Sequence, residues 1–218
     1  MPDVGPILAP LAVAGLLAVM LAFTFGTQRN VRKGNEVLAW LQRGLPGLGP
    51  RATLRWLGSS AVQLDVVDPN EPFRDVACLV VLEPRDVPVL WLAARSRGRR
   101  DVLIVRASLR RAPMIDIEAV DPGAWLTADD ESDPDWRSIE LRPGVRASAT
   151  AAPDPSIVGA VGEAWDDLAA GSGGTWRISI RRTVPHLEVH VRPPQRDGPT
   201  SERLVSAIQR LARSLAGG

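Results

Sequence analysis

Cysteine and histidine are scarce in this sequence, which narrows the chemistry that it can support. The chain of 218 residues has one cysteine and two histidines. The single cysteine, Cys78, cannot form an intrachain disulfide, and it lies in the apolar run of residues 76–82. We therefore expect a reducing compartment, with this thiol acting as a small buried hydrophobic group.

The two histidines do not have the spacing of a metal site. His186 and His190 lie on a predicted strand, where a rise of roughly 3.3 Å per residue places the two rings about 13 Å apart. A single ion cannot bridge that distance, and the H-E-x-x-H order of a helical zinc site is absent. We therefore predict a solvated strand face here, without a metal.

An acidic stretch follows a calcium-binding pattern in its spacing only. Acidic residues occupy positions 1, 3, 5, 7 and 12 of an EF-hand loop: Asp129, Glu131, Asp133, Asp135 and Glu140. Position 6 is Pro134, where the sharp turn of such a loop requires glycine, and no helical pattern flanks it. The sequence favours a solvated acidic loop, with weak binding of a divalent ion or a basic partner as the alternative.

The sequence patterns of catalytic and cofactor sites are also missing. Residues 171–174, Gly-Ser-Gly-Gly, connect a predicted helix to a predicted strand, whereas a phosphate-binding loop leads from a strand into a helix. No G-x-S-x-G motif occurs. These absences favour a non-enzymatic protein without a cofactor. The alternative is a membrane-bound enzyme, which a deep pocket with convergent His186, His190 or acidic side chains would favour.

One long apolar run does occur, near the N-terminus. Residues 7–25 carry no charge and one polar side chain, Thr24, and as a helix these 19 residues extend roughly 28 Å, close to the thickness of a bilayer's hydrocarbon core. A cleaved signal peptide would have a basic flank and a shorter apolar core, whereas the flank here carries only Asp3. We predict a single transmembrane helix over residues 6–26.

The charges on either side of this run predict its orientation. Arg29, Arg32 and Lys33 follow the run, and we expect them to contact lipid headgroups. The positive-inside rule then places residues 1–5 outside the plasma membrane and the bulk of the chain in the cytoplasm.

The remaining residues predict an α+β fold. After a juxtamembrane helix and a Pro- and Gly-containing hinge over residues 27–50, the cytoplasmic domain takes up residues 51–218. Alternating apolar residues and turn signals predict strands at 52–57, 61–67, 75–82, 102–109, 114–120, 136–141, 176–182 and 187–192. Helical spacing predicts helices at 86–97, 155–170 and 201–215. Strands that precede helices in two successive parts favour a mainly antiparallel sheet covered by helices.

Charged residues are strongly segregated along the chain. Residues 29–111 hold 15 basic and 8 acidic residues, residues 112–171 hold 3 and 13, and residues 172–218 hold 8 and 3. The basic stretches supply the predicted polyanion contacts: Arg95, Arg97, Arg99, Arg100, Arg110, Arg111, Arg177 and Arg181. Such a surface would bind the phosphates of RNA or lipid by charge. Base stacking is not expected, because no aromatic residue is interleaved with these arginines. DNA binding is not expected either. Pairing with the chain's own acidic block is the alternative.

Several short motifs follow the apolar run in a particular order. Residues 26–30 are Gly-Thr-Gln-Arg-Asn and residues 39–40 are Ala-Trp. Residues 82–86, Leu-Glu-Pro-Arg-Asp, open a predicted helix, and residues 101–104, Asp-Val-Leu-Ile, open a predicted strand. In this order, and in its terminal strand-turn-strand unit and helix, the chain resembles the calumin-like family over about residues 26–216.

The resemblance implies a function at a membrane. Calumin is a single-pass protein of the endoplasmic reticulum whose cytosolic α+β domain works beside the Sec translocon and the ribosome in multipass membrane-protein biogenesis. The resemblance therefore implies a non-enzymatic adaptor or scaffold. Its implied partners are translocon or insertase subunits and the ribosome, besides membrane lipids. The family's acidic lumenal segment has no counterpart here, so calcium buffering is not implied. The alternative is a regulatory module that binds anionic lipid or RNA.

Overall fold

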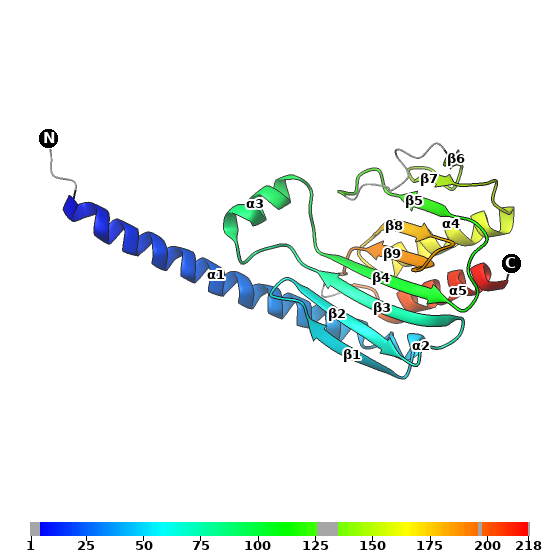
Figure 1. The fold of residues 1–218 in the computed structure, drawn as a ribbon, viewed down its shortest axis with the longest axis horizontal. Helices are drawn as coiled ribbons and strands as arrows, with labels where there is room; N and C mark the ends of the chain where they lie inside the picture. The colour runs from blue at the N-terminus through cyan, green and yellow to red at the C-terminus, as the bar shows by residue number, and fades with distance from the viewer. Residues whose placement is uncertain (1–4, 126–134, 196–197, 218) are drawn as a thin grey trace.

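A computed structural model describes residues 5–125, 135–195 and 198–217 (Figure 1). One long helix projects from a domain built on a nine-stranded sheet. Every strand pair among the described residues is antiparallel. The predicted α+β class is confirmed at this level.

The first helix, α1 (Gly5–Leu41), is one continuous helix that contains both the predicted span and the predicted juxtamembrane helix. Nearly all side chains between Pro10 and Phe25 are exposed, whereas a stripe of buried residues begins at Gly26. Among the described residues, α1 is the one helix that is long and apolar enough to cross a membrane. Only 6% of its most apolar 18 residues are buried inside the protein. A single-pass anchor has these properties, and so does a signal sequence near an N-terminus.

Residues 42–50, where prolines and glycines predicted a hinge, are packed against the domain. This segment contains the short helix α2 (Leu45–Leu48), in which Leu48 is completely buried. The hydroxyl oxygen of Ser201, at the start of α5 (Ser201–Gly217), accepts a hydrogen bond of 2.8 Å from the Gly44 N–H. The connection between α1 and the sheet is therefore fixed by packing and hydrogen bonding.

The strands form one sheet in the order β1-β2-β3-β4-β9-β8-β5-β7-β6. Their bounds are β1 (Arg51–Trp56), β2 (Ala61–Val67), β3 (Phe73–Val81), β4 (Val102–Leu109), β5 (Ile117–Val120), β6 (Arg137–Ile139), β7 (Arg146–Ala149), β8 (Thr175–Ile180) and β9 (Leu187–Val191). The two predicted parts share this sheet because β4 pairs with β9. The sequence did not predict β7, whose residues Arg-Ala-Ser-Ala lack the branched side chains typical of strands.

One main core joins the sheet to the helices. It contains alternate residues of the strands together with residues of α2, α5, α4 (Pro155–Ala170) and the second half of α1. Cys78 lies in this core, as expected for a small hydrophobic group. Burial, with a smaller contribution from the charge of Asp65, raises the pKa of its thiol to about 12. The thiol is therefore unreactive in the folded protein.

Helix α3 (Pro88–Ser96) contributes no buried residue to the domain. The sequence predicted a helix over residues 86–97 from the helical spacing of its apolar residues. In the structure, α3 stands away from the sheet on the side from which α1 projects (Figure 1). Val89, Leu90 and Leu92 are therefore exposed, whereas Trp91, Ala93 and Ala94 are half-buried.

Candidate membrane-proximal site

A buried stripe of small residues marks where α1 meets the domain. Gly26, Asn30 and Gly34 are buried and lie four residues apart, on one face of the helix. A Cβ atom at Gly26 would collide with the backbone of residues 85–86, and one at Gly34 would lie 2.5 Å from the ring of Trp56. Glycine at these positions lets the helix pack directly against the loop before α3 and against β1.

Arg85 connects this stripe to the start of β4. Its guanidinium donates to both carboxylate oxygens of Asp101, each at 3.0 Å, and to Oδ1 of Asn30 at 3.2 Å. The side chains of Arg85 and Asp101 are each only 14% exposed. A bidentate pair of this kind combines charge with fixed geometry, so it holds the loop before α3 against α1.

Glu83 holds α3 on the same junction. Its carboxylate is 3% exposed, accepts from Nε1 of Trp91 at 2.5 Å and from Nη1 of Arg95 at 3.2 Å, and lies 3.6 Å from Arg85. The Arg95 guanidinium also lies over the Trp91 ring, 5.6 Å from its centroid. Arg95, a predicted polyanion contact, is therefore held by the protein itself, although its side chain remains 49% exposed.

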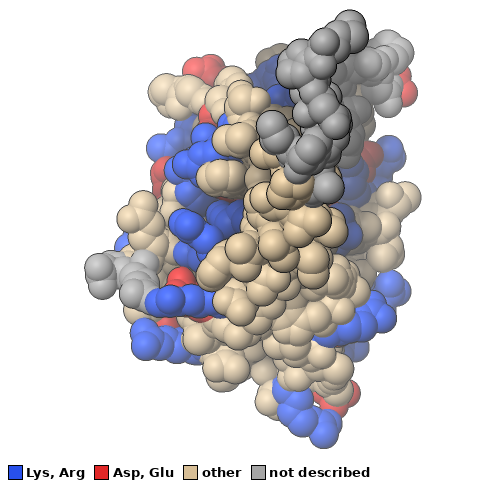
Figure 2. Space-filling model, turned by 90° about the vertical axis from the view of Figure 1, so that its left-hand side faces the viewer, with Lys and Arg blue, Asp and Glu red and all other residues tan. Residues whose placement is uncertain are grey.

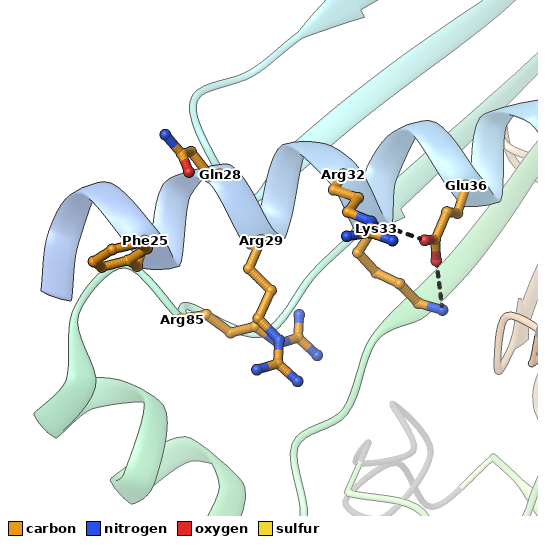
Figure 3. A pocket seen from close by; sticks show the side chains of 7 residues that line it. All are labelled: Phe25, Gln28, Arg29, Arg32, Lys33, Glu36 and Arg85. Carbon is orange, nitrogen blue, oxygen red and sulfur yellow. Dashed lines mark ion pairs between the residues drawn. The ribbon is translucent and has the colours of Figure 1, made fainter.

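The predicted headgroup contacts line a basic pocket beside this junction. Its volume is about 710 Å³, and its lining residues are Phe25, Gln28, Arg29, Arg32, Lys33, Glu36 and Arg85. Arg29 and Arg85 extend to the same side of α1 (Figure 3). Arg32 and Lys33 turn toward Glu36, with nitrogen–oxygen distances of 3.5 and 3.8 Å. Arg85 is paired with Asp101, so the positive charge of the pocket comes from Arg29, Arg32 and Lys33 against Glu36. The pocket begins where the apolar run ends.

The predicted polyanion contacts do not form one surface. One group precedes β4 and consists of Arg97, Arg99 and Arg100, and a second group follows it and consists of Arg110 and Arg111. The strand has eight residues and separates the two groups by roughly 25 Å. Their partners are Trp125 for Arg99, the carbonyls of Arg95 and Arg99 for Arg100, Glu71 for Arg110 and the carbonyl of Ala216 for Arg111. The side chain of Arg97 has no partner among the described residues.

Arg177 and Arg181 belong to a buried group of charges. Glu118, whose side chain is 1% exposed, pairs with both guanidiniums, and the side chain of Arg177 is itself only 9% exposed. The strand β8 is buried on both faces, whereas its sequence predicted a solvated basic face. This group fits the alternative prediction of pairing with the acidic block. The sequence showed no aromatic residues interleaved with these arginines, but the fold brings some together. The Arg181 Cζ, for example, lies 4.7 Å from the centroid of the Trp136 ring.

Both histidines are buried and make protein contacts, so the predicted solvated face is wrong. His186 Nδ1 accepts from the Leu109 N–H at 2.9 Å, and His190 Nε2 lies 2.6 Å from a carboxylate oxygen of Glu188. Within residues 5–125, 135–195 and 198–217, no group of three His, Cys, Asp or Glu side chains could hold a metal ion. The acidic residues 129–133 of the calcium-like pattern lie outside the described residues.

The sequence did not mark Glu83, Arg85 or Asp101 as site residues. All three stand in the short motifs at residues 82–86 and 101–104, and Gly26, Asn30 and Gly34 repeat at intervals of four. These were the available signals. Only the fold shows that they meet, because no local pattern indicates that the loop after β3 packs on α1.

Neither a protein-family model nor a curated protein matches this chain. The resemblance to the calumin-like family therefore remains an expectation from short motifs.

Proposed function

We propose that this protein is a non-enzymatic adaptor that holds a cytoplasmic domain at the plasma membrane through one N-terminal helix. The continuity of α1 carries this proposal, because the helix changes from exposed apolar residues to a buried stripe at Gly26 without a break. The second half of α1 is part of the core, and the segment after it is bonded to α5. A domain attached in this way keeps one orientation to α1, which suits a scaffold that positions a partner beside the membrane.

The resemblance to the calumin-like family supplies the partner class. It favours subunits of a translocon or an insertase, with the ribosome as a further partner, and a role in membrane-protein insertion. A photo-crosslinker at Arg97, exposed beside α3, tests this role in native membranes. Met114, which is 82% exposed and lies after β4, provides the control position.

We expect translocon, insertase or ribosomal components to be recovered from position 97 more than from position 114. Recovery of none of these components from either position would contradict the biogenesis role. Recovery in equal amounts from both would indicate a partner surface that extends beyond the membrane-proximal site.

The basic pocket favours recognition of anionic lipid headgroups as a second candidate function. Four cations line it, and the Arg29 side chain has no partner among the described residues. A cation near an anionic membrane surface contributes about 1 kcal/mol to binding, which corresponds to about a fivefold change in affinity. Removing the Arg29 side chain should therefore weaken phosphate binding with the least effect on the fold.

Lipid that remains bound through purification tests this candidate. The full-length protein and its Arg29→Gln variant are purified in mild detergent, and the anionic lipid retained per protein is measured by mass spectrometry. Arg55→Gln is the matched control, because Arg55 is also exposed but lies on β1. We expect Arg29→Gln alone to lose lipid. Equal retention by all three proteins would count against this function.

A further inference from the structure

Helix α3 presents an apolar surface that the described residues leave uncovered. Val89, Leu90 and Leu92 are 77%, 57% and 61% exposed, and no residue of the helix is buried. Val87, just before the helix, is 38% exposed. Single exposed apolar residues are ordinary, but a helix with several large apolar side chains exposed together indicates a contact surface.

The polar side chains of α3 fix it to the domain. Trp91 and Arg95 lie one turn apart, and both donate to the buried Glu83. With these two side chains turned to the junction, Val89 and Leu92 lie on another face of the helix. The apolar surface therefore has a defined direction, set by the same junction that holds α1.

The helix α3 stands at the level where the apolar run of α1 ends. Gly26, the first buried residue of α1, packs on the backbone of residues 85–86, just before α3 begins. Figure 1 shows α3 extending sideways from α1 at this level, and the sheet lies beyond it along α1. When α1 crosses a bilayer, α3 lies at the membrane boundary and runs across the span.

Basic side chains border this apolar surface. The pocket that contains Arg29 lies on α1 beside the α3 junction, and Arg97, Arg99 and Arg100 follow α3. Figure 2 shows the molecule from the side on which α1 projects, with blue Lys and Arg side chains on both sides of an uncharged surface. An apolar face bordered by cations is complementary to a bilayer surface, where acyl chains lie beneath phosphates.

We infer that α3 is a second membrane contact, whose side chains Val89, Leu90 and Leu92 enter the boundary between headgroups and acyl chains. This inference rests on the proposed function, because it requires α1 to be in the membrane. The bilayer is the occupant favoured over a second copy of the chain, because the surface of α3 adjoins the exposed apolar half of α1 and cations border both. A single span can still tilt within the bilayer, and contact through α3 would limit that tilt.

Fluorescence from single positions of the full-length protein in lipid vesicles tests the inference. The dye NBD is attached to cysteines introduced by Val89→Cys and Leu92→Cys. Leu16→Cys is the control for the anchor, and Met114→Cys is the exposed control remote from it. Native Cys78 does not compete for the label, because burial raises the pKa of its thiol to about 12. The vesicles carry a lipid quencher placed either near the headgroups or deep in the acyl chains.

We expect the dyes at positions 89 and 92 to emit at shorter wavelength than the dye at position 114 and to lose emission to the shallow quencher. The dye at position 16 should lose emission to the deep quencher. Aqueous emission at positions 89 and 92, with quenching at position 16, would overturn the inference and leave the anchor in place. Aqueous emission at position 16 would overturn the proposed function itself. A wavelength shift at 89 and 92 that grows with protein concentration, without lipid quenching, would identify a second copy as the occupant and also overturn the inference.

Discussion

Three shielded carboxylates each bind two basic side chains. The groups are Glu83 with Arg85 and Arg95, Glu118 with Arg177 and Arg181, and Glu188 with Arg106 and His190. The carboxylate side chains are 3%, 1% and 16% exposed. Part of the charge that is segregated along the sequence is thus compensated within the fold. Removing the carboxylate of such a group takes away the partner that both basic side chains share, which costs more than the intact group contributes.

Glu188→Gln should lower stability at neutral pH and lose this effect in acid. Burial raises the pKa of Glu188, but the hydrogen bonds and charges of His190 and Arg106 outweigh burial and lower the pKa to about 2. The unfolded value is about 4.3, so the stabilisation is fully present above that pH and is lost as the pH falls toward 2. Discounted for solvent screening, the effect at neutral pH is about 1–2 kcal/mol.

Thermal unfolding in detergent, measured from about pH 7 down to about pH 3, checks this prediction. Glu71→Gln is the control, because the Glu71 side chain is 85% exposed and its pairing with Arg110 at 3.9 Å is weak. The control should differ little from the parent protein at any pH. A Glu188→Gln deficit of the same size in acid and at neutral pH would contradict the role of its charge.

Among the elements, α1 is a single helix in two environments. Nearly all of its side chains from Pro10 to Phe25 are exposed, and its second half buries Gly26, Asn30, Gly34 and Leu41 along one face. The change is in packing and not in backbone, since the helix runs unbroken through it. The close approach at Gly26 sets how the loop before α3, and hence α3 itself, is placed.

Gly26→Ala should destabilise the domain, whereas Gly15→Ala should not. A Cβ at residue 26 would lie 2.5 Å from the Asp86 Cα, and backbone cannot move aside as a flexible side chain can. Overpacking of this kind costs about 1–3 kcal/mol. A Cβ at residue 15 meets nothing within 4 Å, and alanine favours helix by about 1 kcal/mol over glycine. Unfolding in detergent compares the two variants, and equal stability would show that the junction tolerates displacement.

Across the whole molecule, the features assigned to the membrane lie at one end. The projecting half of α1, the basic pocket and α3 are together, and the C-terminal end of α5 lies at the opposite end of the domain (Figure 1). The positive-inside rule, applied to Arg29, Arg32 and Lys33, predicts that this domain lies in the cytoplasm. Cys78 cannot report the orientation, because its buried thiol would escape an external reagent on either side.

Introduced cysteines can report the orientation instead. In intact cells, a membrane-impermeant maleimide should label Pro2→Cys and should not label Met114→Cys. After permeabilisation it should label both, because Met114 is 82% exposed. Labelling of Met114→Cys in intact cells would reverse the topology and remove the cytoplasmic adaptor function with it.

The sequence by itself predicted the elements whose patterns are local. The uncharged run at residues 7–25 is helical, as expected, and β2 and β4 have the predicted bounds. The predicted helices at 155–170 and 201–215 correspond to α4 and α5. Each of these predictions depends on a periodicity or a turn signal within one window of sequence, which the backbone of that window obeys.

The tertiary structure alone decided how these elements meet. The pairing of β4 with β9 makes one sheet from two predicted parts, and it buries His190 beside Glu188. Helix α3 has the spacing of apolar residues that predicts a packed helix, but none of its residues is buried. Arg85 belongs to the site because Asn30 and Asp101 fold against it, although they lie 55 and 16 positions away in the sequence. A periodic pattern determines which side of an element is apolar, but contacts between distant segments determine what that side faces.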